Sequence, residues 1–215
     1  MAIAFDLDGT LYDTLQTCLD GENYARKIMK LPDLTTEELR SKLQTSDWKA
    51  FYMSIGVKEE DVEDYDKLFF EHYNQQIPTI IAGAKQMLER VEELMGYETV
   101  YIITNASRES VTKRFEKDGL IHYMDRVHTP VEGKAKEIQT LAERHGSIIY
   151  VGDLVSDGEA CKAAIENGAN VRFFAMLHEY SMNPPDRLKE YVQKHEWATG
   201  INTFTELLER VKCDS

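Results

Sequence analysis

Short apolar blocks and helix-like spacing alternate along most of this chain. Blocks at residues 3–7, 99–103, 147–151 and 171–176 are typical of strands buried inside a sheet. Apolar positions at helical spacing follow each of the last three blocks, and Gly119, Gly146 and Gly168 mark expected helix ends. A weaker strand is expected near 126–128. Strands that alternate with helices predict an α/β fold with a doubly wound parallel sheet.

Residues 15–80 have a different pattern, because strand-like blocks are missing and helical spacing dominates. Four helices are expected there, near 15–29, 35–43, 48–55 and 62–73. We therefore predict a small all-helical domain at 15–80, inserted after the first strand of an α/β core domain formed by 1–14 and 81–215. An insertion at this point would project over the carboxyl ends of the strands.

A hydroxyl residue followed three positions later by glutamate is a typical helix start. Three such pairs predict helix starts: Thr35 with Glu38, Ser156 with Glu159, and Thr203 with Glu206. Between the last two pairs, the polar segment 177–200 predicts one helix around 188–192, after two consecutive prolines.

Composition and charge narrow the class of protein. The chain has 215 residues, 42% of them hydrophobic, and a formal net charge of −13. The negative electrostatic field of such a protein would repel nucleic acid and anionic membranes, which argues against either as the partner. The three cysteines are far apart and have no CxxC spacing, which favours reduced thiols over a zinc site. With no signal peptide or apolar run long enough to cross a bilayer, we expect a cytoplasmic protein.

Polar residues follow the expected strands where a parallel sheet places its binding crevice. Asp6 and Asp8 alternate at the end of the first strand, so both carboxylates would point the same way. Thr104 and Asn105 follow a second strand, Asp153 and Asp157 follow a third, and Lys134 begins a helix. Carboxylates brought together from two strands suit a hard cation such as Mg²⁺.

These segments, in this order, resemble the four motifs of the haloacid dehalogenase (HAD) superfamily. The matching residues are Asp6-Leu-Asp8-Gly9-Thr10, Ile103-Thr104-Asn105, Lys134, and Gly152-Asp153-Leu-Val-Ser-Asp157. The insertion at 15–80 resembles the helical C1 cap of that family. The resemblance implies a Mg²⁺-dependent phosphatase that acts on a small phosphorylated metabolite through an aspartyl-phosphate intermediate.

The resemblance also implies a role for each residue. Asp6 would attack phosphorus, and Asp8 would protonate the leaving alcohol and then deprotonate water. Thr104, Asn105 and Lys134 would bind the phosphoryl group. The metal ligands would be Asp6, the carbonyl of Asp8, Asp153, and Asp157 directly or through water.

Several alternatives stay open on the sequence alone. Lys136 lies two positions after Lys134, which is preferred because it follows Gly133 at the expected helix start. A phosphomutase would use the same acids, and a non-catalytic binding protein could share the scaffold. Dehalogenases of this family lack the second acid, so Asp8 argues against that chemistry. Arg40 and Lys42 are candidate specificity residues of the cap, or ordinary exposed cations.

Overall fold

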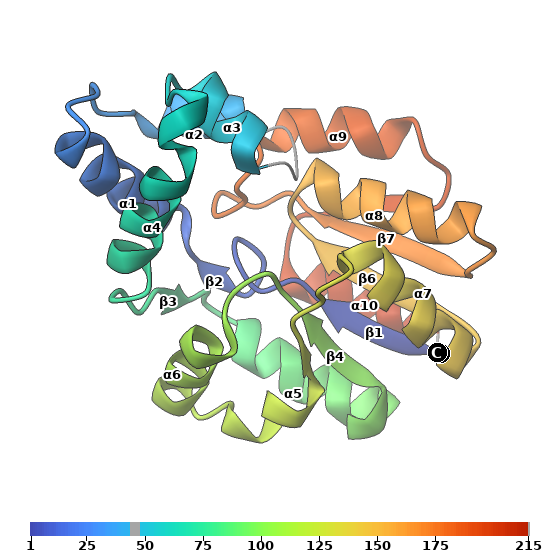
Figure 1. Ribbon diagram of the computed structural model, residues 1–215. Coiled ribbons are helices and arrows are strands. Elements are labelled where there is room, and N and C mark those ends of the chain that lie inside the picture. The colour runs from blue at the N-terminus through green and yellow to red at the C-terminus, as the bar shows by residue number, and fades with distance from the viewer. Residues whose placement is uncertain (44–47, 215) are drawn as a thin grey trace.

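A computed structural model describes residues 1–43 and 48–214 of the chain (Figure 1). Its centre is a six-stranded sheet in the order β5-β4-β1-β6-β7-β8, with every neighbouring pair parallel. The strands are β1 (Ala2–Phe5), β4 (Val100–Ile103), β5 (Val127–His128), β6 (Ile148–Gly152), β7 (Val171–Met176) and β8 (Ala198–Ile201). The predicted α/β fold with a doubly wound parallel sheet is confirmed.

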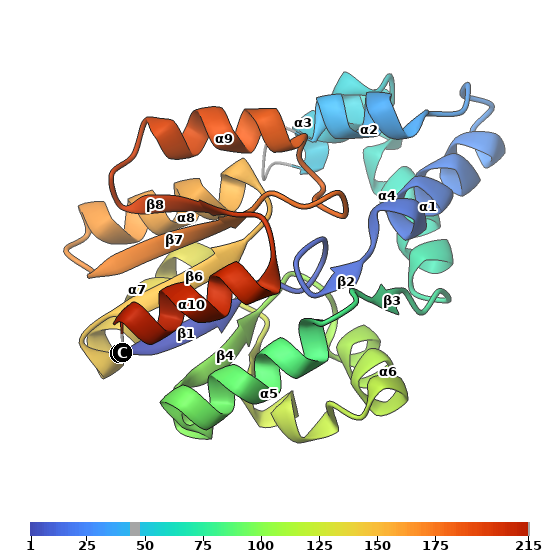
Figure 2. The same ribbon diagram turned by 180° about the vertical axis from the view of Figure 1, so that it is seen from behind.

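Helices cover both faces of this sheet, because successive side chains of a strand point to opposite faces. Ile3 and Phe5 of β1 pack toward α5 (Ala84–Met95), α6 (Arg108–Asp118) and α10 (Phe204–Asp214). Ala2 and Ala4 pack toward α7 (Lys134–His145), α8 (Val155–Glu166) and α9 (Pro185–Gln193). Figure 2 shows α5 and α10 in front of the strands, with α7 and α8 behind them.

Three strands were not predicted. β8 follows α9 in the segment where only a helix was predicted, and its sequence, Ala-Thr-Gly-Ile, has no apolar block. β2 (Tyr12–Asp13) and β3 (Thr79–Ile80) pair antiparallel at the two ends of the helical insertion. Two-residue strands are too short to produce a periodic pattern. Short 3-10 helices are η1 (Glu59–Asp61), η2 (Tyr97–Thr99) and η3 (Ile121–Arg126).

The three predicted helix starts have different outcomes. At Thr35 both hydrogen bonds of the capping box form, since Thr35 N donates to Glu38 Oε2 (2.8 Å) and Glu38 N to Thr35 Oγ1 (3.2 Å). Glu206 N likewise donates to Thr203 Oγ1. The prediction at Ser156 and Glu159 is wrong, because α8 begins at Val155 and Asp157 accepts the N–H of Leu154.

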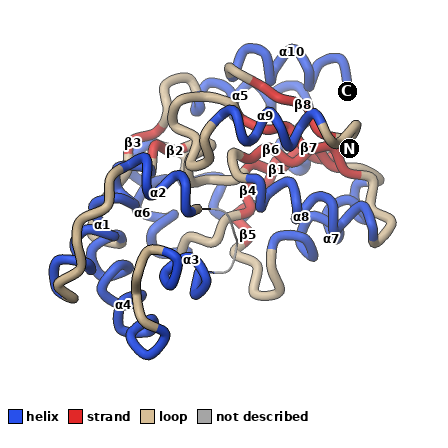
Figure 3. Tube along the Cα trace, turned by 90° about the horizontal axis from the view of Figure 1, so that it is seen from above, coloured by secondary structure: helices blue, strands red, loops and turns tan. Residues whose placement is uncertain are grey.

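The helical insertion consists of α1 (Leu15–Ile28), α2 (Thr36–Lys42), α3 (Trp48–Ser54) and α4 (Val62–Tyr73). Its apolar side chains, among them Leu39, Phe51, Tyr65 and Phe69, form a cluster that also includes Met182 from the loop after β7. Seen from above, these helices lie to one side of the sheet (Figure 3). Within the described residues, no helix is both long and apolar enough to cross a bilayer.

Glu22 makes the stability of this helical cluster depend on pH. Its side chain is fully buried and accepts a hydrogen bond from Tyr65 (2.5 Å). Burial raises the pKa of Glu22 from 4.5 to about 7. Because the pKa of Glu22 is higher in the folded than in the unfolded protein, the protonated side chain favours folding. Its contribution is fully present below about pH 4.5 and is lost as pH rises through 7, which lowers the free energy of unfolding by about 3 kcal/mol.

Glu22→Gln removes this titration. The Tm of the variant minus that of the natural protein should therefore be several degrees larger at pH 8 than at pH 5. Thermal melts at the two pH values measure the difference. Glu63→Gln, at an exposed position of the same insertion, is the control and should show no such change. An equal Tm difference at both pH values for Glu22→Gln would contradict the assignment.

Candidate active site

The end of β1 brings Asp6 to the edge of the sheet and turns sharply at Gly9. Gly9 has φ +77, and a Cβ there would lie 2.4 Å from Asp153 Oδ2. The turn also places Thr10, whose Oγ1 donates to Asp153 Oδ1 at 3.0 Å. A residue with a side chain at position 9 would therefore push the β1 loop away from the end of β6.

Three buried carboxylates converge beyond this turn. Oxygen atoms of Asp6, Asp153 and Asp157 lie within 4.8 Å of one another, and no more than 3% of any of these residues is exposed. Burial raises the pKa of Asp6 to about 7, against the attraction of Lys134. Burial and the neighbouring Asp6 also raise the pKa of Asp153 well above its ordinary value. The cluster is thus unfavourable unless more positive charge is supplied.

Lys134, at the start of α7, is the cation that enters this cluster. Its Nζ lies 2.7 Å from Asp6 Oδ1 and 2.7 Å from Asp157 Oδ1. Although burial opposes its charged form, Asp157 and Asp6 hold the pKa of Lys134 well above its ordinary value. Of the two candidate lysines, Lys134 therefore has its ammonium group beside the predicted nucleophile.

The charges and the donor atoms of this cluster fit a divalent metal ion. One lysine faces three carboxylates, which leaves two negative charges without a partner in the buried cluster if all three acids are ionised. The available donors are oxygen atoms, the ligands that Mg²⁺ prefers. Asp6, Asp153 and Asp157 are the residues that could hold such an ion.

Thr104 and Asn105 follow β4 and line the same cavity as Asp6, Asp8 and Lys134. Thr104 is buried, and its Oγ1 accepts the N–H of Ala106 at 3.0 Å. The hydroxyl proton of Thr104 can therefore point toward a bound anion. The structure thus places all five predicted catalytic and phosphate-binding residues around one cavity.

Asp8 has two partners that the sequence analysis missed. Its Oδ1 accepts hydrogen bonds from Arg114 Nη1 (2.7 Å) and from the hydroxyl of Tyr73 (3.0 Å). Arg114 Nη2 in turn donates to the Tyr73 oxygen at 3.1 Å. Arg114 comes from α6 and Tyr73 from the last helix of the insertion, so this contact joins the predicted acid to both parts of the chain.

A signal for Arg114 was present in the sequence. Val111 and Phe115 are apolar positions at helical spacing in the segment that ends at Gly119, and Arg114 lies three positions after the first. It therefore shares their face of the helix. An arginine that helical spacing buries needs an anionic partner.

Arg40 does not reach the cavity. Its guanidinium group donates to the main-chain oxygens of Glu179 and Ser181, so it fastens α2 to the loop before α9. Lys42 is exposed and lines neither of the cavities at this edge of the sheet. The candidate specificity role for Arg40 is replaced by a structural one.

A family model described as haloacid dehalogenase-like hydrolase matches residues 3–175, which is more than half of the chain. The chain belongs to this family. The resemblance inferred from the four motifs is confirmed, and the protein is a hydrolase of the haloacid dehalogenase-like family.

Individual relatives agree with this assignment. A phosphoglycolate phosphatase of Aliivibrio fischeri (strain ATCC 700601 / ES114) is 27% identical over 209 residues, covering 85% of this chain and 86% of the relative. A haloacid dehalogenase-like hydrolase from Streptococcus pneumoniae has a similar structure, with a TM-score of 0.76 and 18% identity, covering 98% and 97% of the two chains. A protein of Haemophilus somnus 129pt, described as a predicted phosphoglycolate phosphatase, has a TM-score of 0.73 and 20% identity, covering 98% and 97%.

Proposed function

We propose that this hydrolase is a Mg²⁺-dependent phosphatase that hydrolyses a small phosphorylated metabolite through an aspartyl-phosphate intermediate. The observation that carries the proposal is the pair formed by Asp6 and Lys134, 2.7 Å apart and facing the cavity that also holds Asp8 and Thr104. The relative from Aliivibrio fischeri, a phosphoglycolate phosphatase, supports phosphoryl transfer as the reaction type.

Two displacements at phosphorus make up the proposed reaction. A carboxylate oxygen of Asp6 forms a bond to phosphorus while the bond to the leaving oxygen breaks, and Asp8 gives its proton to that oxygen. Asp8 then takes a proton from a water molecule, whose oxygen bonds to phosphorus as the bond to Asp6 breaks. Inorganic phosphate leaves, and both aspartates return to their starting states.

Lys134, Thr104 and Asn105 would stabilise the phosphoryl group during both steps. Negative charge spreads over the equatorial oxygens in the transition state, and donors fixed by the scaffold stabilise it without reorganising. Lys134 has a second task, because its ammonium group reduces the repulsion between the Asp6 carboxylate and an incoming phosphate. Asp157 positions Lys134 by accepting a hydrogen bond from it.

The residues that would hold Mg²⁺ are Asp6, Asp153, the carbonyl of Asp8, and Asp157 directly or through water. When bound there, the ion would supply positive charge between the nucleophile and the phosphate. The three buried carboxylates, two of them with raised pKa values, support this placement.

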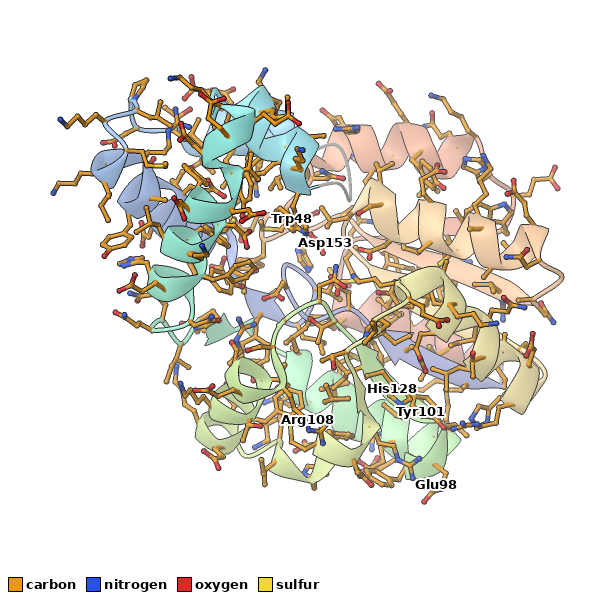
Figure 4. All side chains as sticks on the ribbon, viewed as in Figure 1. Trp48, Glu98, Tyr101, Arg108, His128 and Asp153 are labelled. Carbon is orange, nitrogen blue, oxygen red and sulfur yellow. The ribbon has the colours of Figure 1, made fainter. Side chains whose placement is uncertain are left out.

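Residues 15–80 are proposed to form a cap domain over a core made of 1–14 and 81–215. Phe69, Phe70 and Tyr73 of α4 line the cavity that contains Asp6 and Asp8. Trp48 of the insertion lines the same cavity, and in the view of Figure 4 it is labelled beside Asp153. A cap in this position would exclude bulk water and favour small substrates over phosphoproteins.

A metal-dependence assay tests the proposal. Purified protein should release p-nitrophenol from p-nitrophenyl phosphate in the presence of Mg²⁺, lose nearly all turnover in excess EDTA, and recover when Mg²⁺ is restored. The physical reason is that two anionic groups must approach each other in a buried site. Turnover that EDTA leaves unchanged, or no turnover under any metal condition, would refute the proposed function.

A further inference from the structure

The cavity at the proposed catalytic centre is lined by apolar side chains as well as by the predicted catalytic residues. Its volume is about 150 Å³. Six of the apolar side chains that line it come from the insertion and from the loops after β6 and β7: Leu43, Trp48, Phe69, Phe70, Leu154 and Met182. An apolar space of about this volume can hold one benzene ring. The adjoining cavity of about 480 Å³, which shares Leu43, Trp48 and Lys134 with it, adds room for a substrate that also carries a phosphoryl group.

Positive charge is scarce around this cavity. Among the lining residues that the structure describes, Lys134 is the only lysine or arginine, both here and in the adjoining cavity of about 480 Å³. The adjoining cavity adds an acid, Glu159.

The cations next in sequence to lining residues, Lys42 beside Leu43 and Lys49 beside Trp48, are exposed and line neither cavity. Three further cations already have partners. Lys134 bridges Asp6 and Asp157, and phosphate binding needs it as well. Arg114 is paired with Asp8 and only 1% of it is exposed, while Arg40 binds main-chain oxygens of the core. A negatively charged leaving group would therefore face apolar walls without an ion-pair partner.

We propose that the physiological substrate is a phosphate monoester with an uncharged, largely apolar leaving group of about the size of an aromatic ring. This inference rests on the proposed function and specifies its substrate class. Trp48 and Phe70 line the cavity and remain 40% and 42% exposed, which is the surface that such a group would cover. The relative from Aliivibrio fischeri is described as a phosphoglycolate phosphatase. Phosphoglycolate has a carboxylate on its leaving group and therefore falls outside the proposed class.

Two synthetic esters separate charge from other properties of the substrate. Benzyl phosphate and 4-carboxybenzyl phosphate have leaving alcohols of nearly equal acidity, and only the second carries a carboxylate. With Mg²⁺, kcat/KM from phosphate release should be at least about 10-fold higher for benzyl phosphate. Phosphoglycolate should also be a poorer substrate than benzyl phosphate. Equal or better turnover of either carboxylate ester would overturn the inference.

Variants of the apolar lining test its role directly. Trp48→Ala should raise KM for benzyl phosphate about 10-fold and change KM for methyl phosphate little, since methyl phosphate does not reach the ring. Ile121→Ala removes an equally exposed apolar side chain far from the site and should have no effect. Phe70→Arg should shift the preference toward 4-carboxybenzyl phosphate about 10-fold. Unchanged preferences in both variants of the lining would contradict the inference.

These outcomes are distinct from a failure of the proposed function. If no monoester is turned over with Mg²⁺, p-nitrophenyl phosphate included, the phosphatase proposal fails and the substrate class fails with it. If p-nitrophenyl phosphate is hydrolysed but the carboxylate esters are preferred, only the substrate class is wrong.

Discussion

Asp6→Asn is expected to lower kcat/KM for every phosphate ester by at least about 10⁴-fold. The amide is nearly isosteric with the carboxylate but cannot form the phosphoenzyme, and it removes one of the carboxylates available to the metal ion. Phosphate release from p-nitrophenyl phosphate with Mg²⁺ measures the loss. Residual activity within 10-fold of the natural protein would refute the nucleophilic role of Asp6.

The same substitution should not destabilise the fold. Burial raises the pKa of Asp6 to about 7, so at higher pH the ionised side chain opposes folding when no metal is bound. Asp6→Asn removes this charge, and its Tm at pH 8 with EDTA is expected to equal or exceed that of the natural protein. An inactive variant with an unchanged or higher Tm separates a chemical loss from a folding defect.

The elements that could be predicted from the sequence are those with periodic apolar positions or with glycine or capping residues at their ends. The blocks of β1, β4 and β6 are buried on both faces and therefore read as continuous apolar runs, and that of β7 is interrupted only by Arg172. β8 lies at the edge of the sheet, where Thr199 and Gly200 need not be apolar, so its pattern was too weak. The start of α8 was misplaced because Asp157, not a hydroxyl residue, accepts the N–H group at its first turn.

The candidate site could be assembled because the ends of parallel strands meet at one edge of the sheet. That rule brings Asp6, Thr104 and Asp153 together without knowledge of any side-chain contact. The partners of Asp8 do not follow from it, since Tyr73 is 65 positions away and Arg114 is 106 positions away, both on helices. Their contact depends on how the insertion and α6 pack around the β1 loop, which a local pattern does not specify.

Asp8→Ala is expected to destabilise the protein by about 3 kcal/mol, in addition to any effect on catalysis. Although burial opposes the charge of Arg114, Asp8 and Tyr73 raise its pKa, so the guanidinium stays ionised. Removing Asp8 leaves this cation, 1% exposed, with the hydroxyl of Tyr73 as its neighbour. Breaking a fully buried ion pair can cost more than this, but the Asp8 side chain is 27% exposed, so the expected loss in the free energy of unfolding is at the lower end. Urea unfolding measures the loss.

Asp8→Asn keeps an oxygen acceptor for Arg114 and should retain most of this stability, so it is the variant suited to kinetics. It should slow turnover of alkyl phosphates far more than that of p-nitrophenyl phosphate, whose leaving group needs no proton.

Asp186→Ala, at an exposed position, is the stability control and should stay within about 0.5 kcal/mol of the natural protein. If Asp8→Ala is as stable as this control, the pair with Arg114 contributes nothing. If the double variant Asp8→Ala with Arg114→Met regains the stability of the natural protein, the loss seen in Asp8→Ala comes from the unpaired guanidinium of Arg114.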